Sequence, residues 1–119
     1  MKIEIYHPEP DYLLLQIMAG IHRKTSRHME HWEIVSHKGV SNLTQRDLKY
    51  YFKVLLMPVL KKDKIVFIYQ YHEYSDPTHY VQCEYAGKLT ECILYNFGEQ
   101  VTKICSIPDS ELSEREDLN

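Results

Sequence analysis

The sequence predicts an α+β domain, in which an N-terminal strand and helix precede a five- or six-stranded antiparallel meander. Three observations support this. The chain has 119 residues, the size of one domain. One early segment repeats apolar residues at helical spacing, and later segments alternate apolar and polar residues between turns. Such a sheet must curl into a small barrel or wrap around the helix, because a flat sheet would expose an apolar face and a long edge.

The N-terminal elements follow from local spacing. Ile3 and Ile5 alternate with polar neighbours, as in a short strand. Pro10 suits the first turn of a helix. The apolar stripe of this helix keeps a spacing of three and four and comprises Leu14, Ile17, Met18 and Ile21. Because of Gly20, the pattern does not fix the residue at which the helix ends. Residues 22–28 predict an exposed helix end or a loop.

The middle of the chain predicts further strands. Residues 30–36 alternate, with Trp32 and Ile34 on one face, and Lys38-Gly39 ends the run. Residues 45–57 fit either a helix or a strand, and their aromatic and β-branched content together with Pro58 favours a strand.

The clearest strand covers residues 65–74, followed by a turn at Asp76-Pro77. Residues 79–85, 89–95 and 100–107 continue the meander. The expected register places Val66 and Ile68 on the core face. Residues 1–107 then form one globular domain, and residues 108–119 form an acidic, disordered tail. In order of elements, this arrangement resembles the calycin-type small barrels and the cystatin-like folds that wrap a sheet around a helix, a likeness that implies no functional residue.

The amino-acid composition indicates the cellular compartment of the protein. No run approaches the roughly 20 apolar residues that cross a bilayer, and the N-terminus lacks the positive charge of a signal peptide. We therefore expect a cytoplasmic protein without a membrane partner. Its three cysteines have no C-x-x-C spacing, which predicts reduced, buried thiols.

Catalytic and metal-binding patterns are absent from the sequence. It contains no P-loop, nucleophile elbow or dinucleotide fingerprint, so we expect no enzyme and no cofactor. Three histidines, His28, His31 and His37, flank Trp32. On a strand, His31 and His37 would lie roughly 20 Å apart, too far to share one ion. We therefore expect no metal site and interpret these histidines as surface imidazoles.

The leading functional hypothesis is a non-catalytic accessory, inhibitor or adaptor protein that acts by protein–protein contact. The chain has ten tyrosines, a residue type enriched in interfaces. In the expected hairpin, four aromatic residues form a ladder on the face opposite the core. We predict this ladder as the partner-binding surface: Phe67, Tyr69, Tyr71 and Tyr80.

Two alternatives stay open. A small barrel could hold an amphipathic ligand against Gln70, His72 and Tyr74. Residues 20–64 contain ten basic and four acidic residues, a balance of +6 that could contact nucleic acid. The candidate nucleic-acid-binding residues are Arg23, Lys24, Arg27, Lys49 and Lys53.

Overall fold

The computed structural model describes residues 1–46, 54–71 and 79–108. Within these residues, six strands form one antiparallel sheet in the order β2-β3-β4-β5-β1-β6. The strands are β1 (Lys2–Tyr6), β2 (Trp32–His37), β3 (Val40–Gln45), β4 (Val54–Leu60), β5 (Lys64–Tyr71) and β6 (Lys103–Ile107). The predicted α+β class with an antiparallel meander is confirmed. The sheet is not closed into a barrel, because β2 and β6 remain as its two edges.

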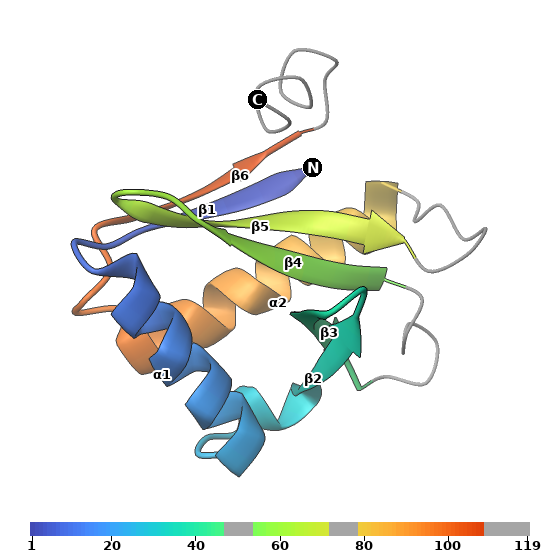
Figure 1. Ribbon diagram of the computed structural model, residues 1–119, viewed down its shortest axis with the longest axis horizontal. Helices are drawn as coiled ribbons and strands as arrows, with labels where there is room; N and C mark the ends of the chain where they lie inside the picture. Colours follow the sequence, from blue (N-terminus) through green and yellow to red (C-terminus); the bar gives the residue numbers. More distant parts are fainter. Residues whose placement is uncertain (47–53, 72–78, 109–119) are drawn as a thin grey trace.

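Two helices cover one face of the sheet: α1 (Pro10–Arg23) and α2 (His79–Phe97). Figure 1 shows both helices on the same side of the sheet, with β2 and β3 turned down toward them. A short 3₁₀ helix, η1 (Met29–His31), leads into β2. Neither helix in the described part of the chain has the length and apolar character needed to cross a membrane.

Helix α1 forms as the sequence predicts. Pro10 lies at its first turn, and Leu13, Ile17 and Ile21 are buried against the sheet. Gly20 does not end the helix. A Cβ at this position would lie 2.9 Å from Cε of Met29, so glycine allows Met29 to pack closely against α1.

The strand predicted over residues 30–36 is confirmed as β2, and its predicted end at Lys38-Gly39 is the turn of a hairpin with β3, a strand that was not predicted from the sequence. Both residues have positive φ, 53° and 78°, the conformation that two-residue hairpin loops of type I′ require. The turn fixes the register, and Trp32 is therefore paired with Gln45 at the open end of the hairpin.

The strands predicted for residues 79–85 and 89–95 are wrong, because this segment is the helix α2. Tyr85, Leu89 and Cys92 are buried at spacings of four and three, which is a helical stripe. A glycine within a segment favours a turn on local grounds, but Gly87 does not interrupt this helix. Gly87 lies on the exposed side of the helix, where an added Cβ would meet no atom within 4 Å.

The two faces of β5 are the reverse of the prediction. Phe67 and Tyr69 belong to the core that the helices cover, and Phe67 is paired with Ile3 of β1. Val66 and Ile68, which were expected in that core, alternate with them on the opposite face of the strand, where Val66 is nevertheless buried at 1% exposure. The reversal follows from α2, which supplies an apolar partner for the aromatic face of the strand.

Some expectations fall outside the described residues. The strand favoured for residues 45–57 is confirmed where β4 begins at Val54, but residues 47–53 are not described. The turn at Asp76-Pro77 and residues 109–119 of the predicted tail also lie outside.

Candidate functional site

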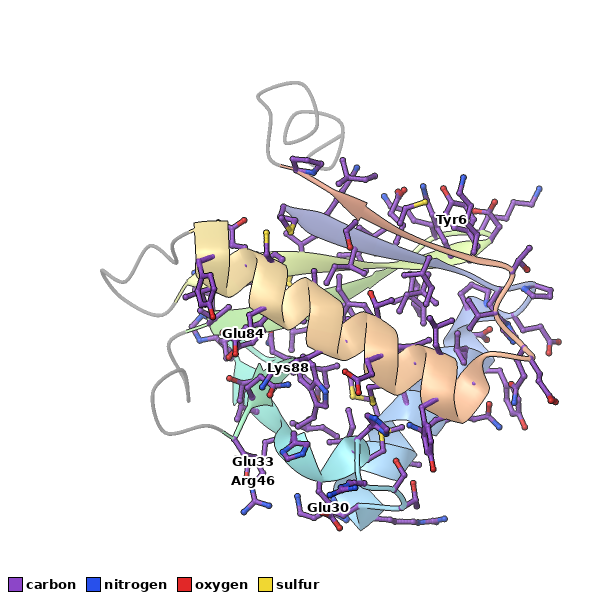
Figure 2. All side chains as sticks on the ribbon, turned by 180° about the vertical axis from the view of Figure 1, so that it is seen from behind. Tyr6, Glu30, Glu33, Arg46, Glu84 and Lys88 are labelled. Carbon is purple, nitrogen blue, oxygen red and sulfur yellow. The ribbon has the colours of Figure 1, made fainter. Side chains whose placement is uncertain are left out.

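A cavity of about 350 Å³ lies where η1, the end of β3 and α2 meet. We call it the corner cavity, and its described lining consists of Arg27, His28, His31, Trp32, Gln45, Lys88 and Glu91. Figure 2 shows Lys88 on the face of α2 that is turned toward β2 and β3. The volume falls in the range of about 300–1,000 Å³ that is typical of small-molecule pockets.

A tight turn before β2 brings two histidines to this cavity. The carbonyl of Ser26 accepts hydrogen bonds from the amides of Met29 and Glu30, at 3.1 and 3.2 Å. The buried Met29 side chain anchors the turn in the core. Because the backbone winds here before it extends into β2, His28 and His31 both reach the corner cavity.

The backbone of Gln45 is held firmly behind the cavity. Its amide donates to the hydroxyl oxygen of Tyr85 at 3.3 Å. The Tyr85 ring packs edge-on against Trp32, with centroids 5.8 Å apart. Thr44, which precedes Gln45 in the chain, donates its hydroxyl hydrogen to the carbonyl of Val54 at 2.9 Å. These contacts fix the position of the Gln45 backbone.

The Nε2 atom of the Gln45 side chain lacks a hydrogen-bond partner within the described residues. The residue is only 2% exposed, and its Nε2 is buried without an acceptor. A buried donor left unsatisfied costs about 1–3 kcal/mol. The terminal amide torsion is broad and nearly two-fold, so a rotation exchanges the positions of Oε1 and Nε2. A polar group inside the cavity could therefore satisfy this amide.

His28 is held in place from α2. Its Nε2 lies 2.9 Å from Oε1 of Glu91, and its ring centroid lies 4.3 Å from that of Tyr95. An ionised carboxylate only accepts hydrogen bonds, so Nε2 carries the proton that it donates. The Nδ1 atom is occluded and has no partner among the described residues. His28 therefore forms part of the cavity wall, with Nε2 engaged by Glu91 and Nδ1 buried.

The charged side chains of the lining are two cations and one carboxylate. Nζ of Lys88 lies 3.7 Å from Oε1 of Glu84, one turn earlier on α2. Arg27 forms no ion pair with any described residue. Glu91, the acidic residue of the lining, is in contact with His28. The cavity is therefore weakly cationic when its histidines are neutral.

The described residues offer little for metal or thiol chemistry. Among them, no group of three or more histidine, cysteine, aspartate or glutamate side chains could hold a metal ion. Burial raises the pKa of Cys92 to about 11, although a hydrogen bond from Asn96 opposes this rise. The Cys92 thiol therefore stays protonated near neutral pH and is a poor nucleophile.

The predicted aromatic ladder does not form. Phe67 and Tyr69 are buried, at 0% and 6% exposure, and the hydroxyl of Tyr69 donates to the carbonyl of Gln82 in α2. Tyr80 lies on α2 rather than on a paired strand and is 71% exposed. The side chain of Tyr71 lies outside the described part of the chain. The ladder required residues 79–85 to be a strand, and the helix separates its members.

The other predicted site residues are dispersed. Gln70 is half-buried and pairs with Leu55 on the outer face of the sheet, away from the corner cavity, whereas His72 and Tyr74 are not described. Of the five basic residues, Arg23, Lys24 and Arg27 are exposed, and Lys49 and Lys53 lie outside the described residues. Among the predicted site residues that the structure describes, Arg27 alone lines the corner cavity.

Sequence reasoning missed the rest of the cavity. Strand periodicity separated His28 from His31, but η1 brings both to one wall. Lys88 and Glu91 are three residues apart and share a helix face, a signal that was lost when this segment was interpreted as strands. A search for family models, curated proteins and solved structures similar to this chain found no match to any of the three.

Proposed function

We propose that this protein binds a small polar molecule in the corner cavity and does not transform it chemically. The observation that supports this proposal most strongly is Nε2 of Gln45, which has no hydrogen-bond partner among the described residues and belongs to a cavity-lining residue that is almost fully buried. Buried polar groups in folded proteins are nearly always hydrogen-bonded, and exceptions call for an explanation such as a bound water or ligand. The tethered backbone of Gln45 makes this a prepared recognition point.

The chemistry of the lining supports binding rather than catalysis. The described lining residues include no hydroxyl or thiol that could act as a nucleophile. Nε2 of His28 is engaged by Oε1 of Glu91 at 2.9 Å, so this nitrogen is not free to act as a base toward the cavity.

A second cavity, of about 440 Å³, lies between α1 and the end of α2, but it offers less for recognition. Arg23 is its charged lining residue among those described. Oε1 of Gln16 is unpartnered there, yet Nε2 of the same side chain already donates to Tyr12, and Gln16 is only half-buried. We therefore favour the corner cavity as the ligand site, because the unpartnered Nε2 of Gln45 is stronger evidence for a ligand than the larger volume of the second cavity.

Nuclear magnetic resonance tests the proposal directly. A ¹⁵N-labelled protein is titrated with small polar fragments of neutral, anionic and cationic character. We expect shifts to cluster at Gln45, Lys88 and Glu91. The variant Gln45→Met has nearly the same side-chain shape without the amide and should lose this response.

The matched control is Gln70→Met, which makes the same change at the residue first considered for ligand binding on the outer sheet face. This variant should respond like the wild type. If no fragment perturbs the corner residues, or if both variants bind as well as the wild type, the proposal is wrong.

A second candidate function is protein–protein contact through α2. Three large apolar or aromatic side chains of this helix are exposed: Tyr80, Leu94 and Tyr95 at 71%, 54% and 68%. Tyr80 and Leu94 are two heptads apart, so they lie along one stripe of the helix. Exposed aromatic residues on one element are typical of interaction surfaces.

The α2 stripe is tested by affinity enrichment from host extract with the double variant Tyr80→Ser/Leu94→Ser. A specific partner should be recovered by the wild type and lost with this variant. The control is Tyr12→Ser, which removes another exposed tyrosine, at 52%, from α1. Equal recovery with all three proteins would reject the contact surface.

A further inference from the structure

We infer that the ligand of the corner cavity carries an anionic group, a carboxylate or a phosphate, that binds between Arg27 and Lys88. This inference rests on the proposed function and names the chemical class of the ligand. In this arrangement the two cations bind the charged group of the ligand, and the side-chain amide of Gln45 hydrogen-bonds to a neighbouring polar atom of the ligand. A carboxylate ligand and a phosphate ligand have one feature in common here, a compact negative charge beside a hydrogen-bonding group.

The placement of the cations supports an anion. Arg27 precedes η1 and Lys88 lies on α2, so the two charges approach the cavity from different elements. Arg27 has no carboxylate partner among the described residues. A guanidinium presents its donors in a planar fork that matches carboxylate and phosphate oxygens.

Lys88 is also available to a ligand. Its distance of 3.7 Å to Glu84 is well beyond the length of about 2.7–2.9 Å of a tight charge-assisted hydrogen bond. The Lys88 side chain is 44% exposed, so this pair is loose and lies in contact with water. A ligand anion can therefore compete with Glu84 for the ammonium group.

The carboxylate of the lining does not cancel this attraction. Oε1 of Glu91 accepts from His28 at 2.9 Å, and the Glu91 side chain is 66% exposed. Its charge is therefore screened by water on one side and engaged by the imidazole on the other. Two cations and one engaged carboxylate leave the cavity attractive to a negative group.

The unpartnered amide adds the second point of recognition. Gln45 is 2% exposed and its Nε2 has no acceptor, so an anion that also supplies an acceptor at this wall gains a hydrogen bond inside the protein. A chloride ion or a bare cation cannot do this while also filling a cavity of about 350 Å³. The ligand is thus a small organic anion rather than a simple ion.

The test compares isosteric probes by chemical-shift titration of the full chain. Benzoate carries the charge, benzamide has the same shape without it, benzylamine carries the opposite charge, and phenyl phosphate separates the two anion sources. We expect benzoate or phenyl phosphate to bind about tenfold more tightly than benzamide, the advantage of one charge-assisted contact. The stronger of the two anions identifies the source.

Variants separate this inference from the proposed function. Lys88→Met should remove the preference for the anion while benzamide binding is retained, and Lys62→Met on the β4–β5 turn is the matched control that should change nothing. Equal binding of benzoate and benzamide, or tighter binding of benzylamine, overturns the anion class while the binding function stands. If none of the four probes shifts the corner residues, the inference and the proposed function fail together.

Discussion

Two clusters of buried polar side chains in this molecule differ in one respect, the completeness of their hydrogen bonding. On the outer face of the sheet, the buried Glu4 carboxylate binds Nζ of Lys64 and accepts from the hydroxyl of Tyr6. At the corner cavity, Gln45 and His28 each keep a buried nitrogen without a partner among the described residues. Figure 2 shows Tyr6 and Lys88 on opposite sides of the molecule.

The comparison separates stabilisation from recognition. The outer cluster is complete, since Lys64 also lies 5.1 Å above the Tyr6 ring and Lys103 adds a second cation at 5.4 Å. A buried charge needs such partners, and the cluster leaves nothing for a ligand. At the corner cavity, two buried nitrogens lack partners among the described residues, and a cavity of about 350 Å³ lies beside them. This is the pattern expected where another molecule supplies the missing contacts.

The largest effect should come from breaking the complete cluster. Lys64→Met leaves the Glu4 carboxylate, whose side chain is only 8% exposed, without its cation. Removing one partner of a buried ion pair costs about 3 kcal/mol, and we expect the free energy of unfolding to fall by about this amount in urea denaturation. Lys103→Met is the matched control, because Lys103 contacts only the Tyr6 ring in this cluster and its loss should cost well under half as much. Equal losses in both variants would show that Lys64 does not act through Glu4.

The same pair predicts a pH dependence. The hydrogen bond to Glu4 is the main cause that raises the pKa of Lys64 above its ordinary value of 10.5. A raised pKa stabilises the fold fully below the pKa of the unfolded chain, and this contribution is lost as the pH rises through the folded value. The difference in stability between the wild type and Lys64→Met should stay constant from neutral pH up to about 10, and shrink above 10.5. A difference that persists at higher pH would contradict a charge-based origin.

A smaller effect tests helix α2, which contributes Lys88 and Glu91 to the corner cavity. Gly87 lies on the exposed side of α2, and an alanine methyl group there meets nothing within 4 Å. Gly87→Ala should raise the free energy of unfolding by about 0.5–1 kcal/mol, because alanine favours the helix. Gly39→Ala is the control, since its φ of +78° strains any other residue and should lower stability. Destabilisation by Gly87→Ala would indicate a turn at this position instead.

The smallest effect should come from the incomplete cluster, with the opposite sign to that at Lys64. Gln45→Met removes an unsatisfied buried amide, so the unliganded protein should gain about 0.5 kcal/mol in thermal or urea unfolding. Thr44→Val makes a similar polar-to-apolar change at a hydroxyl that is hydrogen-bonded, and should cost about 1 kcal/mol. A loss of stability in both variants would mean that Gln45 is already satisfied in the free protein.

Local sequence patterns predicted much of the fold. The alternation of Ile3 and Ile5, the helical stripe ending at Ile21 and the Lys38-Gly39 turn each depend on neighbouring residues, and all three are confirmed. Helix α2 was missed because tyrosine, valine and cysteine favour strands, while Gly87 suggested a break. Burial of Tyr85, Leu89 and Cys92 on one helix face outweighs these local preferences.

The candidate site was harder to predict because it joins three distant segments. His28 lies just before η1, Gln45 ends β3, and Lys88 lies on α2. No short sequence motif contains these three residues. The sequence grouped His28, His31 and His37 instead, of which the structure places the first two at one cavity. The orphaned amide of Gln45 can be recognised only when its neighbours in space are known.

The resonance of the Gln45 side-chain amide gives the most direct test of the central claim, that the incomplete cluster is completed by a ligand. In the free protein, we predict amide protons that show no scalar coupling across a hydrogen bond and a resonance that moves strongly when benzoate is added. The Gln70 amide serves as the internal reference and should stay in place. A Gln45 resonance that does not move while benzoate perturbs other residues, or one already hydrogen-bonded to protein in the free state, would contradict the claim.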